Sequence, residues 1–496
     1  MYTEIRRNPL LLTDAYSLSH DAFKATTDYE TSHIYNRKQG MILFGFTELV
    51  TGFLSAIEVT HPMIDEAVRK AEAFHLTFPE ALFRRVVDEL GGRIPLRVQC
   101  LPEGMYCPPG TPFAQVTNTV PGFASLVTWW EGIFLQGHFA SACATEAMHM
   151  RLYLEELRRK HGYDEGFLTR FHSFGFRGHR SLEDAYWAGR AWSLFLTSSD
   201  DFHISGHEAD CPLSSIPALA HLVVQQFDDE MTCFTRAIDV AVKEGAAAVA
   251  LVIDTYDAYN VIRNMIVPLA KHAEEKGLKH LVFRPDSGDT WKQAVDIYDV
   301  VSNNGLNKAP DLSISVIIGE GMSFSEAKKA DIFFLKNNVP LTFISYGIGA
   351  GFYKHIHRDT LGWAMKTGHS NGAPRMKFSE NPLKRSIPGR LAVTYQGSKL
   401  LAIQESELSE GNEGQNLYGD VYWFDSSRLT SETETGSTMN LNVMKLHLRQ
   451  DDIVKTRSMA AEEMADKESL DQVFILTSQK TKDLVRLFVE KYKKGR

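Results

Sequence analysis

The sequence predicts an α/β fold: a central barrel of parallel strands and helices, with a second α+β domain built from both chain ends. The first observation is four short apolar runs that stop abruptly in polar or glycine-rich turns, at residues 249–257, 281–289, 314–321 and 341–351. The second is their spacing, because the turns begin at Asp254, Pro285, Gly319 and Gly347, in steps of 31, 34 and 28 residues. Each step leaves room for one helix, as in consecutive βα units.

The composition is that of an ordinary globular chain. Its 496 residues are 44% hydrophobic and 23% charged, which is enough for two or three domains or one large one with additions. A net charge of −9 argues against a protein whose main partner is nucleic acid. Five cysteines without CxxC spacing predict no disulfide framework and a reducing compartment. We expect a cytoplasmic protein without a membrane span, because no apolar run approaches 18 residues and the N-terminus lacks a signal-peptide core.

The first third of the chain alternates helical and β-like patterns. A short helix is expected to begin near Ala15, and residues 63–90 have apolar positions at helical spacing, interrupted at a proline. Residues 91–116 are rich in Pro and Gly with alternating apolar positions, which predicts short strands and turns. The amphipathic stretch 125–161 predicts one or two helices that lead into the barrel.

The barrel itself is expected to span residues 135–360. A strand and glycine-flanked turn at 167–178 come first, then a helix at 181–196 and a polar loop at 198–212. A serine start and a first-turn proline predict a helix over 214–227. The four strand-end units follow, and the segments 1–134 plus 361–496 would form the flanking α+β domain.

Charged residues and glycines gather where the strands end, which is where barrel enzymes carry their sites. The set is Arg177, Asp254, Asp257, Arg284, Asp286, Glu320 and Arg358, with glycines 319, 321, 347, 349 and 351. Glycine turns let backbone N–H groups approach a phosphate, and arginine grips phosphate with two donors. Carboxylates bind Mg²⁺ or sugar hydroxyls. The pattern predicts a site for a phosphorylated sugar with a magnesium-bound polyphosphate, and salt bridges with structural turns are the alternative.

Other residues are ambiguous by themselves. His221 lies in an apolar stretch and would ordinarily be a packing histidine, and Tyr16 and Phe174 would ordinarily be packing aromatics. The stretch 200–208 offers possible metal ligands in Asp200, Asp201, His203, His207 and Glu208, but their spacing matches no zinc pattern. The chain has no GxSxG, HExxH, P-loop or early GxGxxG motif, so nothing favours a serine hydrolase, a zincin, a P-loop enzyme or a Rossmann dehydrogenase.

Eight motifs together resemble one known family. They are TDAY at 13–16, HSFGFRG at 172–178, SIPALAH ending at His221, DTYDAYN at 254–260, FRPDSGD at 283–289, GEG at 319–321, YGIGAG at 346–351 and HRD at 357–359. As a set they resemble the nicotinate/nicotinamide phosphoribosyltransferases, which are type II phosphoribosyltransferases, and in particular the nicotinamide phosphoribosyltransferases. The similarity runs from about residue 8 to past Arg390.

The resemblance implies an irregular TIM-like α/β barrel with a second domain, working as a head-to-tail homodimer whose active sites lie at the subunit interface. The implied reaction transfers phosphoribosyl from phosphoribosyl pyrophosphate to nicotinamide, with Mg²⁺, and gives nicotinamide mononucleotide and pyrophosphate in NAD biosynthesis. ATP is implied as a coupled co-substrate that phosphorylates a histidine, and His221 matches that histidine.

The resemblance also implies how the base is held. Phe174 and Tyr16 of the partner subunit would sandwich the pyridine ring. Asp200 would accept the amide N–H of nicotinamide. Arg177 would line the base and phosphate pocket, and Arg284 would hold either the phosphates or the base amide.

The sugar and phosphates would be held by a second group. Asp286 would lie close to base and ribose, and Asp257 near the ribose and His221. Arg358 would neutralise pyrophosphate. The 5′-phosphate and ribose would lie against Gly319, Glu320, Gly349 and Ala350.

The chemistry of the implied reaction agrees with this set of base-binding and phosphate-binding residues. Pyridine nitrogen is already a nucleophile, and the barrier lies in breaking the bond from C1 to pyrophosphate, which builds positive charge on the ribose. Catalysis would come from alignment and from neutralising the leaving group, while Asp257 and Asp286 would stabilise the cationic sugar.

Three positions depart from the family pattern. Ile253 stands where a small polar residue is usual, Glu320 replaces an aspartate, and Ala350 interrupts a glycine run.

Three alternative functions stay open. A nicotinate or quinolinate phosphoribosyltransferase would need a cation in the base pocket, where Asp200 would repel a carboxylate. A non-catalytic protein of the same fold would not need Arg284 and His221 together. A sugar-phosphate isomerase would need a Lys or Glu base at a strand end, for which Glu320 is the one candidate.

Overall fold

The computed structural model describes residues 7–204, 213–379, 381, 384–396, 399–409, 415–425, 476–477 and 479–493. The chain divides into two compact units, which are treated separately below: unit 1, residues 1–145 with 356–496, and unit 2, residues 146–355. The boundaries expected from sequence, 134/135 and 360/361, fall inside the helices α6 (Glu131–Gln136) and α15 (Arg358–Leu361). The division in the structure lies 11 residues later at the first boundary and 5 residues earlier at the second.

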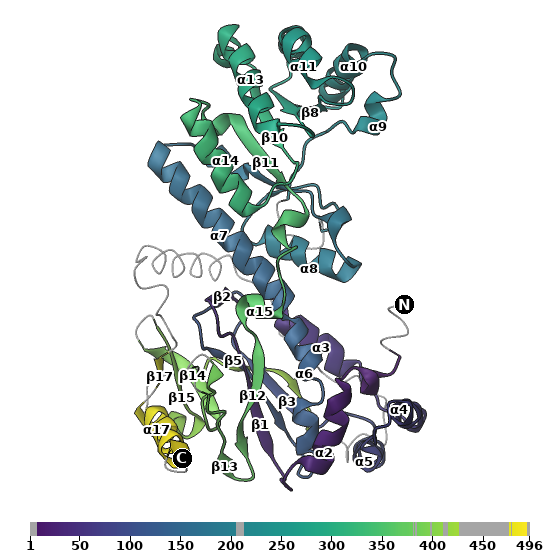
Figure 1. The fold of residues 1–496 in the computed structure, drawn as a ribbon, viewed down its shortest axis with the longest axis vertical. Helices are drawn as coiled ribbons and strands as arrows, with labels where there is room; N and C mark the ends of the chain where they lie inside the picture. The colour runs from purple at the N-terminus through teal and green to yellow at the C-terminus, as the bar shows by residue number, and fades with distance from the viewer. Residues whose placement is uncertain are drawn as a thin grey trace. The chain divides into compact units, whose positions relative to one another are not determined.

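Unit 2 is built on a parallel sheet (Figure 1). Its described strands, in spatial order, are β7 (Ser198–Ser199), β6 (Phe171–Ser173), β11 (Ile344–Ile348), β10 (Ser313–Ile318), β9 (His280–Arg284) and β8 (Ala248–Val252). Every neighbouring pair is parallel. Three of the four strand-end units predicted from sequence thus contain the adjacent strands β8, β9 and β10, and the fourth contains β11.

A short extended segment joins the two edges of this sheet. Ser214 forms a bridge with Ser198 at the β7 edge, and Ala218 forms one with Ala250 at the β8 edge. The backbone N–H of Ala250 donates to the Pro217 carbonyl at 2.8 Å, and Leu219 donates to the Ala250 carbonyl at 2.9 Å. The sheet is therefore curled into a closed, irregular barrel, which confirms the predicted α/β barrel.

The helix predicted over 214–227 is wrong. Only His221–Val224 are helical (α9), and the residues before them are extended between the sheet edges. The physical reason is that two unpaired strand edges offer backbone partners to this segment. Apolar spacing over so short a run does not distinguish the two conformations.

Helices follow the strands and lie outside the barrel (Figure 1). They are α8 (Leu182–Ser193), α10 (Glu230–Lys243), α11 (Ala258–Asn260), α12 (Ile266–Lys276), α13 (Thr290–Asn303) and α14 (Phe324–Lys336). Helices α10, α12, α13 and α14 contact one another in that order. Ser181, Asp229, Asp289 and Ser323 cap the starts of α8, α10, α13 and α14, each accepting a backbone N–H two or three positions inside the helix.

A buried charge pair stabilises the end of the barrel opposite the strand C-termini. Asp331 on α14 is 2% exposed and accepts from Arg170, which precedes β6, at 2.7 Å. The hydroxyls of Tyr153 and Tyr346 donate to the same carboxylate at 2.8 and 2.7 Å. These bonds join α14, β6, β11 and the long helix α7 (His138–His161). Both oxygens of Asp331 accept hydrogen bonds, and Arg170 also donates to the Ile344 carbonyl, so the buried charges are fully hydrogen-bonded.

Unit 1 contains an antiparallel sheet that mixes both chain ends (Figure 1). In order, its strands are β13 (Ala373–Pro374), β12 (Ala364–Ser370), β1 (Glu30–Tyr35), β5 (Pro112–Asn118), β3 (Leu96–Cys100) and β16 (Gly419–Trp423). A two-stranded piece, β2 (Met41–Ile42) with β4 (Tyr106–Cys107), accompanies it. The pairing of β1 with β12 unites segments more than 300 residues apart, as the predicted second α+β domain requires.

The helices of unit 1 agree with the periodicity of the sequence. The expected short helix starts at Ala15 as a 3₁₀ turn, η2 (Ala15–Ser19), and continues in α2 (His20–Phe23). Then come α3 (Phe46–Ser55), α4 (His61–Ala73) and α5 (Glu80–Leu90), the last two separated at Pro79 as expected. No helix in the described part of the chain is both long and apolar enough to cross a membrane.

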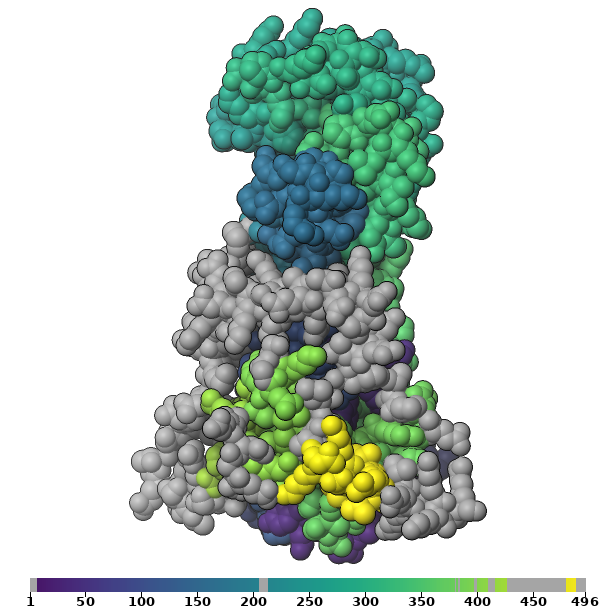
Figure 2. All heavy atoms as spheres, turned by 90° about the vertical axis from the view of Figure 1, so that its left-hand side faces the viewer, coloured from purple at the N-terminus to yellow at the C-terminus, as the bar shows by residue number. Residues whose placement is uncertain are grey.

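A smaller sheet completes the described part of unit 1. It contains β14 (Leu391–Gln396), β15 (Lys399–Gln404) and β17 (Leu476–Thr477). Helix α17 (Gln479–Lys493) packs on β15 and is yellow beside the yellow-green strands in Figure 2. In unit 2, residues 205–212 of the polar loop predicted over 198–212 lie outside the described residues.

Candidate active site

The predicted barrel residues meet at one end of unit 2. Phe174 follows β6, Asp200 follows β7, Arg284 ends β9, and Gly319 and Gly349 follow β10 and β11. Because the strands are parallel and the barrel is closed, their C-terminal ends form a single mouth. Residues from five strands, scattered over 176 positions from 174 to 349 in the sequence, are thereby brought to one place.

His221 is held among polar side chains at this mouth rather than in the core. Its Nδ1 lies 3.0 Å from Oγ1 of Thr255, and its Nε2 lies 3.4 Å from Oδ2 of Asp286 and 3.8 Å from Oδ1 of Asp254. The ring is 39% exposed, so it is oriented and still reachable. This arrangement favours a chemical role for His221 over the packing role that histidines in apolar stretches usually have.

Asp254, rather than Asp257, is the carboxylate of the DTYD turn that lies beside His221. Asp254 is 5% exposed and accepts a short hydrogen bond from Ser287 through Oδ2. Oδ1 of Asp254 receives no hydrogen bond from any described residue. Asp257 is exposed and caps α11 by accepting the N–H of Asn260 at 3.1 Å. The sequence assigned the ribose side to Asp257, which stays a prediction.

The ring of Phe174 packs directly against Gly347. A Cβ added to Gly347 of β11 would lie 2.5 Å from Cε2 of Phe174, and the Gly319 backbone is 3.5 Å from the same point. The Phe174 N–H donates to the Ile348 carbonyl at 3.0 Å, and the ring centroid lies 4.8 Å from that of His172. Glycine at 347 therefore makes room for an aromatic platform at the floor of the mouth.

Asp200 is a polar group close to this platform. His172 Nε2 donates to its Oδ1 at 3.0 Å, and Ser215 donates a short hydrogen bond to the same oxygen. Burial by itself would raise the pKa of Asp200, but the two hydrogen bonds, together with the charges of His172 and Arg284, outweigh it and lower the pKa. The carboxylate is therefore ionised at neutral pH and accepts hydrogen bonds.

Arg284 supplies a donor in the same region. Its side chain is half-buried, its charge acts on Asp200, and Nε forms no hydrogen bond with a described residue. A buried guanidinium nitrogen without an acceptor is costly unless a ligand provides one. The mouth thus offers a carboxylate acceptor and an unused guanidinium donor that are close enough for their charges to interact.

Asp201, which the sequence offered only as a possible metal ligand, is held by structural hydrogen bonds. It is 4% exposed, and it accepts the Ser173 hydroxyl at 2.5 Å and the Phe176 N–H at 2.9 Å. Its own N–H donates to Ser199 at 2.9 Å. These bonds shape the turn between β6 and the 3₁₀ turn that carries Arg177. The sequence signal for such a structural role was the pair of adjacent aspartates at a strand end, because one residue of such a pair is usually structural.

The proposed phosphate edge is formed by exposed turns. Glu320 and Ala350 are exposed, and no described partner of Glu320 is identified. Gly351 allows the two turns to touch, because a Cβ there would lie 2.0 Å from the Met322 carbonyl oxygen. The turns after β10 and β11 are therefore adjacent, as a shared phosphate would require.

Two predicted site residues, Tyr16 and Arg358, belong to unit 1. Tyr16 is 63% exposed on η2. Arg358 is the first residue of α15, 57% exposed, and pairs with Asp359 at 3.1 Å. An exposed tyrosine is free to contact a ligand or another chain, so its environment agrees with a role at an interface better than with core packing.

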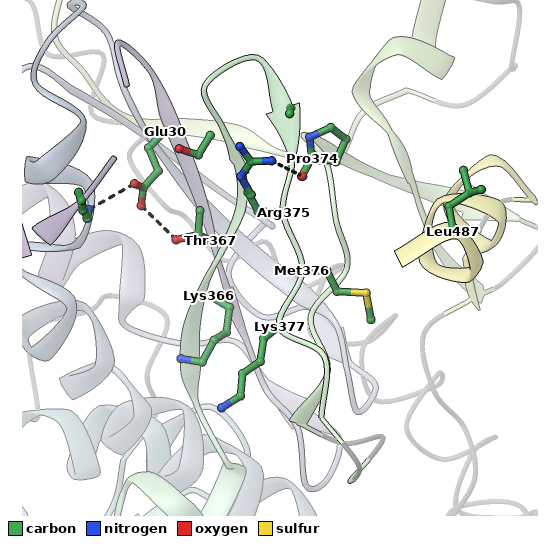
Figure 3. Close-up of a pocket in the computed structure, with 11 residues that line it drawn as sticks. Glu30, Lys366, Thr367, Pro374, Arg375, Met376, Lys377 and Leu487 are labelled. Atoms are coloured by element: carbon green, nitrogen blue, oxygen red, sulfur yellow. Dashed lines mark hydrogen bonds and ion pairs between the residues drawn. The ribbon is translucent and has the colours of Figure 1, made fainter. Parts of the chain in front are cut away.

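Unit 1 also contains a cationic cavity of about 780 Å³ that the sequence did not predict. Lys366, Arg375 and Lys377 line it, and Figure 3 shows the two lysines extending in the same direction. Burial, with the nearby charges of Arg37, Lys377 and Arg358, lowers the pKa of Lys366. An anionic ligand would relieve the repulsion among these cations, so the charge of the cavity favours an anion.

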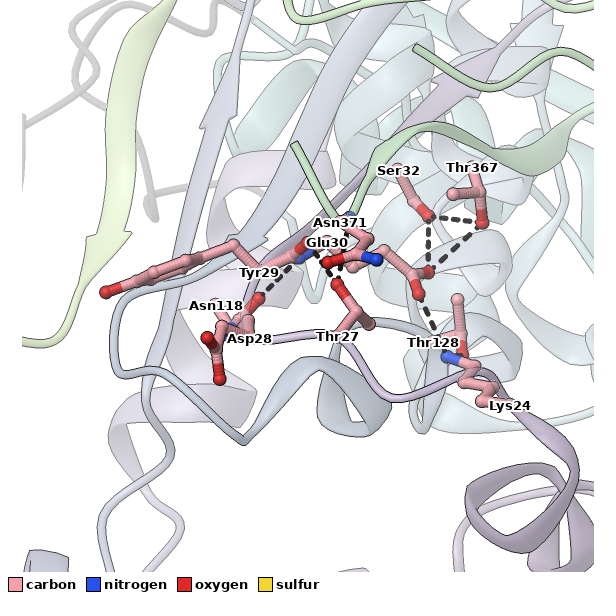
Figure 4. A network of polar contacts seen from close by, with 10 residues as sticks. All are labelled: Lys24, Thr27, Asp28, Tyr29, Glu30, Ser32, Asn118, Thr128, Thr367 and Asn371. Carbon is pink, nitrogen blue, oxygen red and sulfur yellow. Dashed lines mark hydrogen bonds and ion pairs between the residues drawn. The ribbon is translucent and has the colours of Figure 1, made fainter. Parts of the chain in front are cut away.

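The described lining of this cavity includes one carboxylate, and that carboxylate is already paired. Glu30 is 3% exposed and accepts from Lys24 at 3.2 Å and from Thr367 at 3.1 Å, with Ser32 at 3.4 Å (Figure 4). Lys24 is thereby neutralised. The net charge presented by the remaining lining is positive, which suits a polyphosphate.

The fold and the mouth define an α/β barrel with a polar site at the C-terminal ends of its strands. Comparison with solved structures gives the same fold: human nicotinic acid phosphoribosyltransferase aligns with a TM-score of 0.59 at 18% identity, over 97% of this chain and 100% of that one. Nicotinate-nucleotide pyrophosphorylase from Pyrococcus furiosus aligns with a TM-score of 0.56 at 14% identity, over 87% and 95%.

Sequence comparison identifies the family. Residues 169–375 match the nicotinate phosphoribosyltransferase (NAPRTase) family, and residues 8–98 match the nicotinamide phosphoribosyltransferase N-terminal domain. Nicotinamide phosphoribosyltransferase of Xanthomonas campestris is 25% identical over 72% of this chain and 80% of its own length. Nicotinate phosphoribosyltransferase of Mus musculus is 27% identical over 64% of each. The chain belongs to this family, and it is a type II phosphoribosyltransferase, a pentosyltransferase of NAD biosynthesis.

Proposed function

We propose that the enzyme is a nicotinamide phosphoribosyltransferase, which joins nicotinamide to phosphoribosyl pyrophosphate. One observation carries the choice of base: the ionised acceptor Asp200 and the unused donor Arg284 lie at the same platform. A carboxamide has one N–H₂ donor and one C=O acceptor, so it satisfies both. A carboxylate has acceptors only and would be repelled by Asp200.

The transfer needs little from the protein in the way of proton chemistry. The pyridine nitrogen attacks C1 of the ribose while the bond from C1 to pyrophosphate breaks, and pyrophosphate leaves with the bonding electrons. Phe174 would orient the ring, and Asp286 would lie on the cationic sugar side, 3.4 Å from His221. Alignment and charge stabilisation would supply most of the rate enhancement.

Arg358 would neutralise the charge of the leaving pyrophosphate. The glycine turns at 319 and 349 would hold the 5′-phosphate through backbone N–H groups. A homodimer, in which Tyr16 of the partner subunit covers the ring opposite Phe174, completes the proposal.

Mg²⁺ would accompany the pyrophosphate. Within the described residues no group of three or more His, Cys, Asp or Glu is arranged to hold a metal. Mg²⁺ is commonly held by one or two carboxylates together with substrate phosphates, and the unpartnered, buried Oδ1 of Asp254 fits such an ion, with Asp286 as the second ligand. When bound, the ion would neutralise charge on the leaving group.

ATP coupling through His221 is the second part of the proposal. Its Nδ1 is near Thr255 and its Nε2 near Asp286, so the neighbouring groups orient the ring for phosphorylation. In His221→Ala, the rate with ATP divided by the rate without ATP should fall to 1, and ATP hydrolysis should stop. Survival of ATP stimulation in that variant would exclude the phosphohistidine.

A base-selection assay tests the main proposal. Purified enzyme is incubated with phosphoribosyl pyrophosphate, Mg²⁺ and either nicotinamide or nicotinate, and each mononucleotide is quantified. Nicotinamide mononucleotide should be the main product. Turnover of nicotinate but not of nicotinamide would make the enzyme a nicotinate phosphoribosyltransferase, a candidate favoured by the similarity to the murine enzyme of that name.

A further inference from the structure

The interior face of β6 carries His172. Phe171 and Ser173, its neighbours in the strand, are buried, and Phe171 packs against Phe324 of the outer helix α14 with ring centroids 6.1 Å apart. Successive side chains of a strand point to opposite faces. His172 therefore points into the barrel, toward the platform formed by Phe174.

Ser215 reaches the same point from the segment that closes the barrel. This segment is attached to the sheet through backbone groups of Ser214, Pro217 and Leu219. The Ser215 hydroxyl takes no part in that closure, and its partners are Oδ1 of Asp200 and, at 3.5 Å, the Ile216 carbonyl. The fold thus does not require the hydroxyl, although Asp200 uses it.

The two donors converge on one oxygen. His172 Nε2 and Ser215 Oγ both donate to Oδ1 of Asp200, and no described residue donates to Oδ2. A carboxylate held through one oxygen has a fixed orientation, and its second oxygen keeps its lone pairs for a ligand. Arg284 contributes charge without a direct hydrogen bond to Asp200.

We propose that His172 and Ser215 are specificity-determining residues, which orient Asp200 so that Oδ2 accepts the amide N–H of the base. The proposal rests on the proposed function, because it presumes a carboxamide substrate. Both residues act through Asp200 and are positioning residues. With both donors in place the pocket accepts an amide and repels a carboxylate. Without one of them, Asp200 is held less firmly toward the amide, and the discrimination between an amide and a carboxylate decreases.

The test uses two removals and two conservative replacements in the full-length enzyme. Ser215→Ala and His172→Leu each delete a donor, whereas Ser215→Thr and His172→Gln keep one. Each deletion should raise the KM for nicotinamide roughly tenfold, the lower range for a hydrogen bond to a partly exposed charged group. Changes in kcat should stay within about threefold, and the conservative variants should recover most of the loss.

The pH profile distinguishes positioning from a general structural defect. Because the donors lower the pKa of Asp200, their removal should raise it, and the acidic limb of kcat/KM for nicotinamide should move to higher pH. The ratio of kcat/KM for nicotinamide to that for nicotinate should fall at least tenfold in both deletions. An unchanged ratio and an unmoved acidic limb in folded Ser215→Ala would overturn the proposal.

Measurements on the wild-type enzyme distinguish a failure of the proposed function from a failure of the role given to His172 and Ser215. If wild type converts nicotinate and not nicotinamide, the proposed function fails whatever the variants do. If wild type converts nicotinamide and the deletions keep wild-type selectivity, the proposed function stands and the role of His172 and Ser215 is wrong. Loss of folding in His172→Leu, measured by its thermal transition, leaves Ser215→Ala with its exposed site as the deciding variant.

Discussion

Replacing Gly347 by alanine probes the aromatic platform without touching a hydrogen-bonding group. The new Cβ would lie 2.5 Å from Cε2 and 2.6 Å from Cδ2 of Phe174. Ordinary contacts begin near 3.4 Å, so the ring must move by about 1 Å or rotate away. Gly347 does not have a positive φ, which means that alanine fits the backbone and the effect comes from the ring alone.

The cost should appear in binding of the base. An aromatic pair contributes about 0.5–1.5 kcal/mol beyond the area it buries, which corresponds to a roughly 2- to 12-fold higher KM for nicotinamide. The assay is steady-state kinetics with nicotinamide varied at saturating phosphoribosyl pyrophosphate. Gly419→Ala is the matched control, because Gly419 is also a strand glycine and an added Cβ meets nothing within 4 Å.

A double-mutant cycle decides whether the ring is the cause. In a Phe174→Ala background, Gly347→Ala should have almost no further effect, because the clashing atoms are gone. Additive losses in the cycle, or a KM in Gly347→Ala equal to that of Gly419→Ala, would refute the reasoning that this glycine exists to accommodate the ring.

Three further predictions concern other parts of unit 2. Asp331→Asn should lower the free energy of unfolding by about 3–5 kcal/mol in denaturant titration, because it leaves the Arg170 charge buried without its counterion; a loss below about 1 kcal/mol contradicts this. Asp201→Asn should reduce kcat/KM at least tenfold with little change in the thermal transition, since Asn keeps one acceptor oxygen and either Ser173 or the Phe176 N–H loses its acceptor; unchanged kinetics would make Asp201 irrelevant to the site. Arg284→Lys should raise the KM for nicotinamide if the guanidinium reads the amide, whereas a rise confined to the KM for phosphoribosyl pyrophosphate would assign it to the phosphates.

Local pattern predicted the strands and most helices well, and the reason is physical. An apolar run ending in a polar turn has few alternatives to a buried strand, as β8, β9 and β10 confirm. Helices with charged outer faces and Ser or Asp caps are equally explicit. The 214–219 segment was misread because its partners are strand edges far along the chain, which local spacing does not report.

The site was predicted in part for the same reason. Phe174, His221 and Arg284 stood out as residue types at strand ends or within recognised motifs. The pairing of Asp200 with His172 and Ser215 could not be read from the sequence, because it depends on β7 lying beside β6 and on the closing segment arriving next to both. The sequence likewise did not single out Lys366 and Lys377, which the structure brings to the wall of one cavity.

The sequence by itself determined the α/β rhythm of this protein, the family to which it belongs and the identity of its chemically active residue types, because each depends on neighbours within a few tens of positions. Only the tertiary structure decided which aspartate faces His221, which oxygen of Asp200 is free, and how a glycine in β11 makes room for Phe174. Those choices depend on the closure of the barrel, which sets distances of 2.5–4 Å between residues that are distant in the chain.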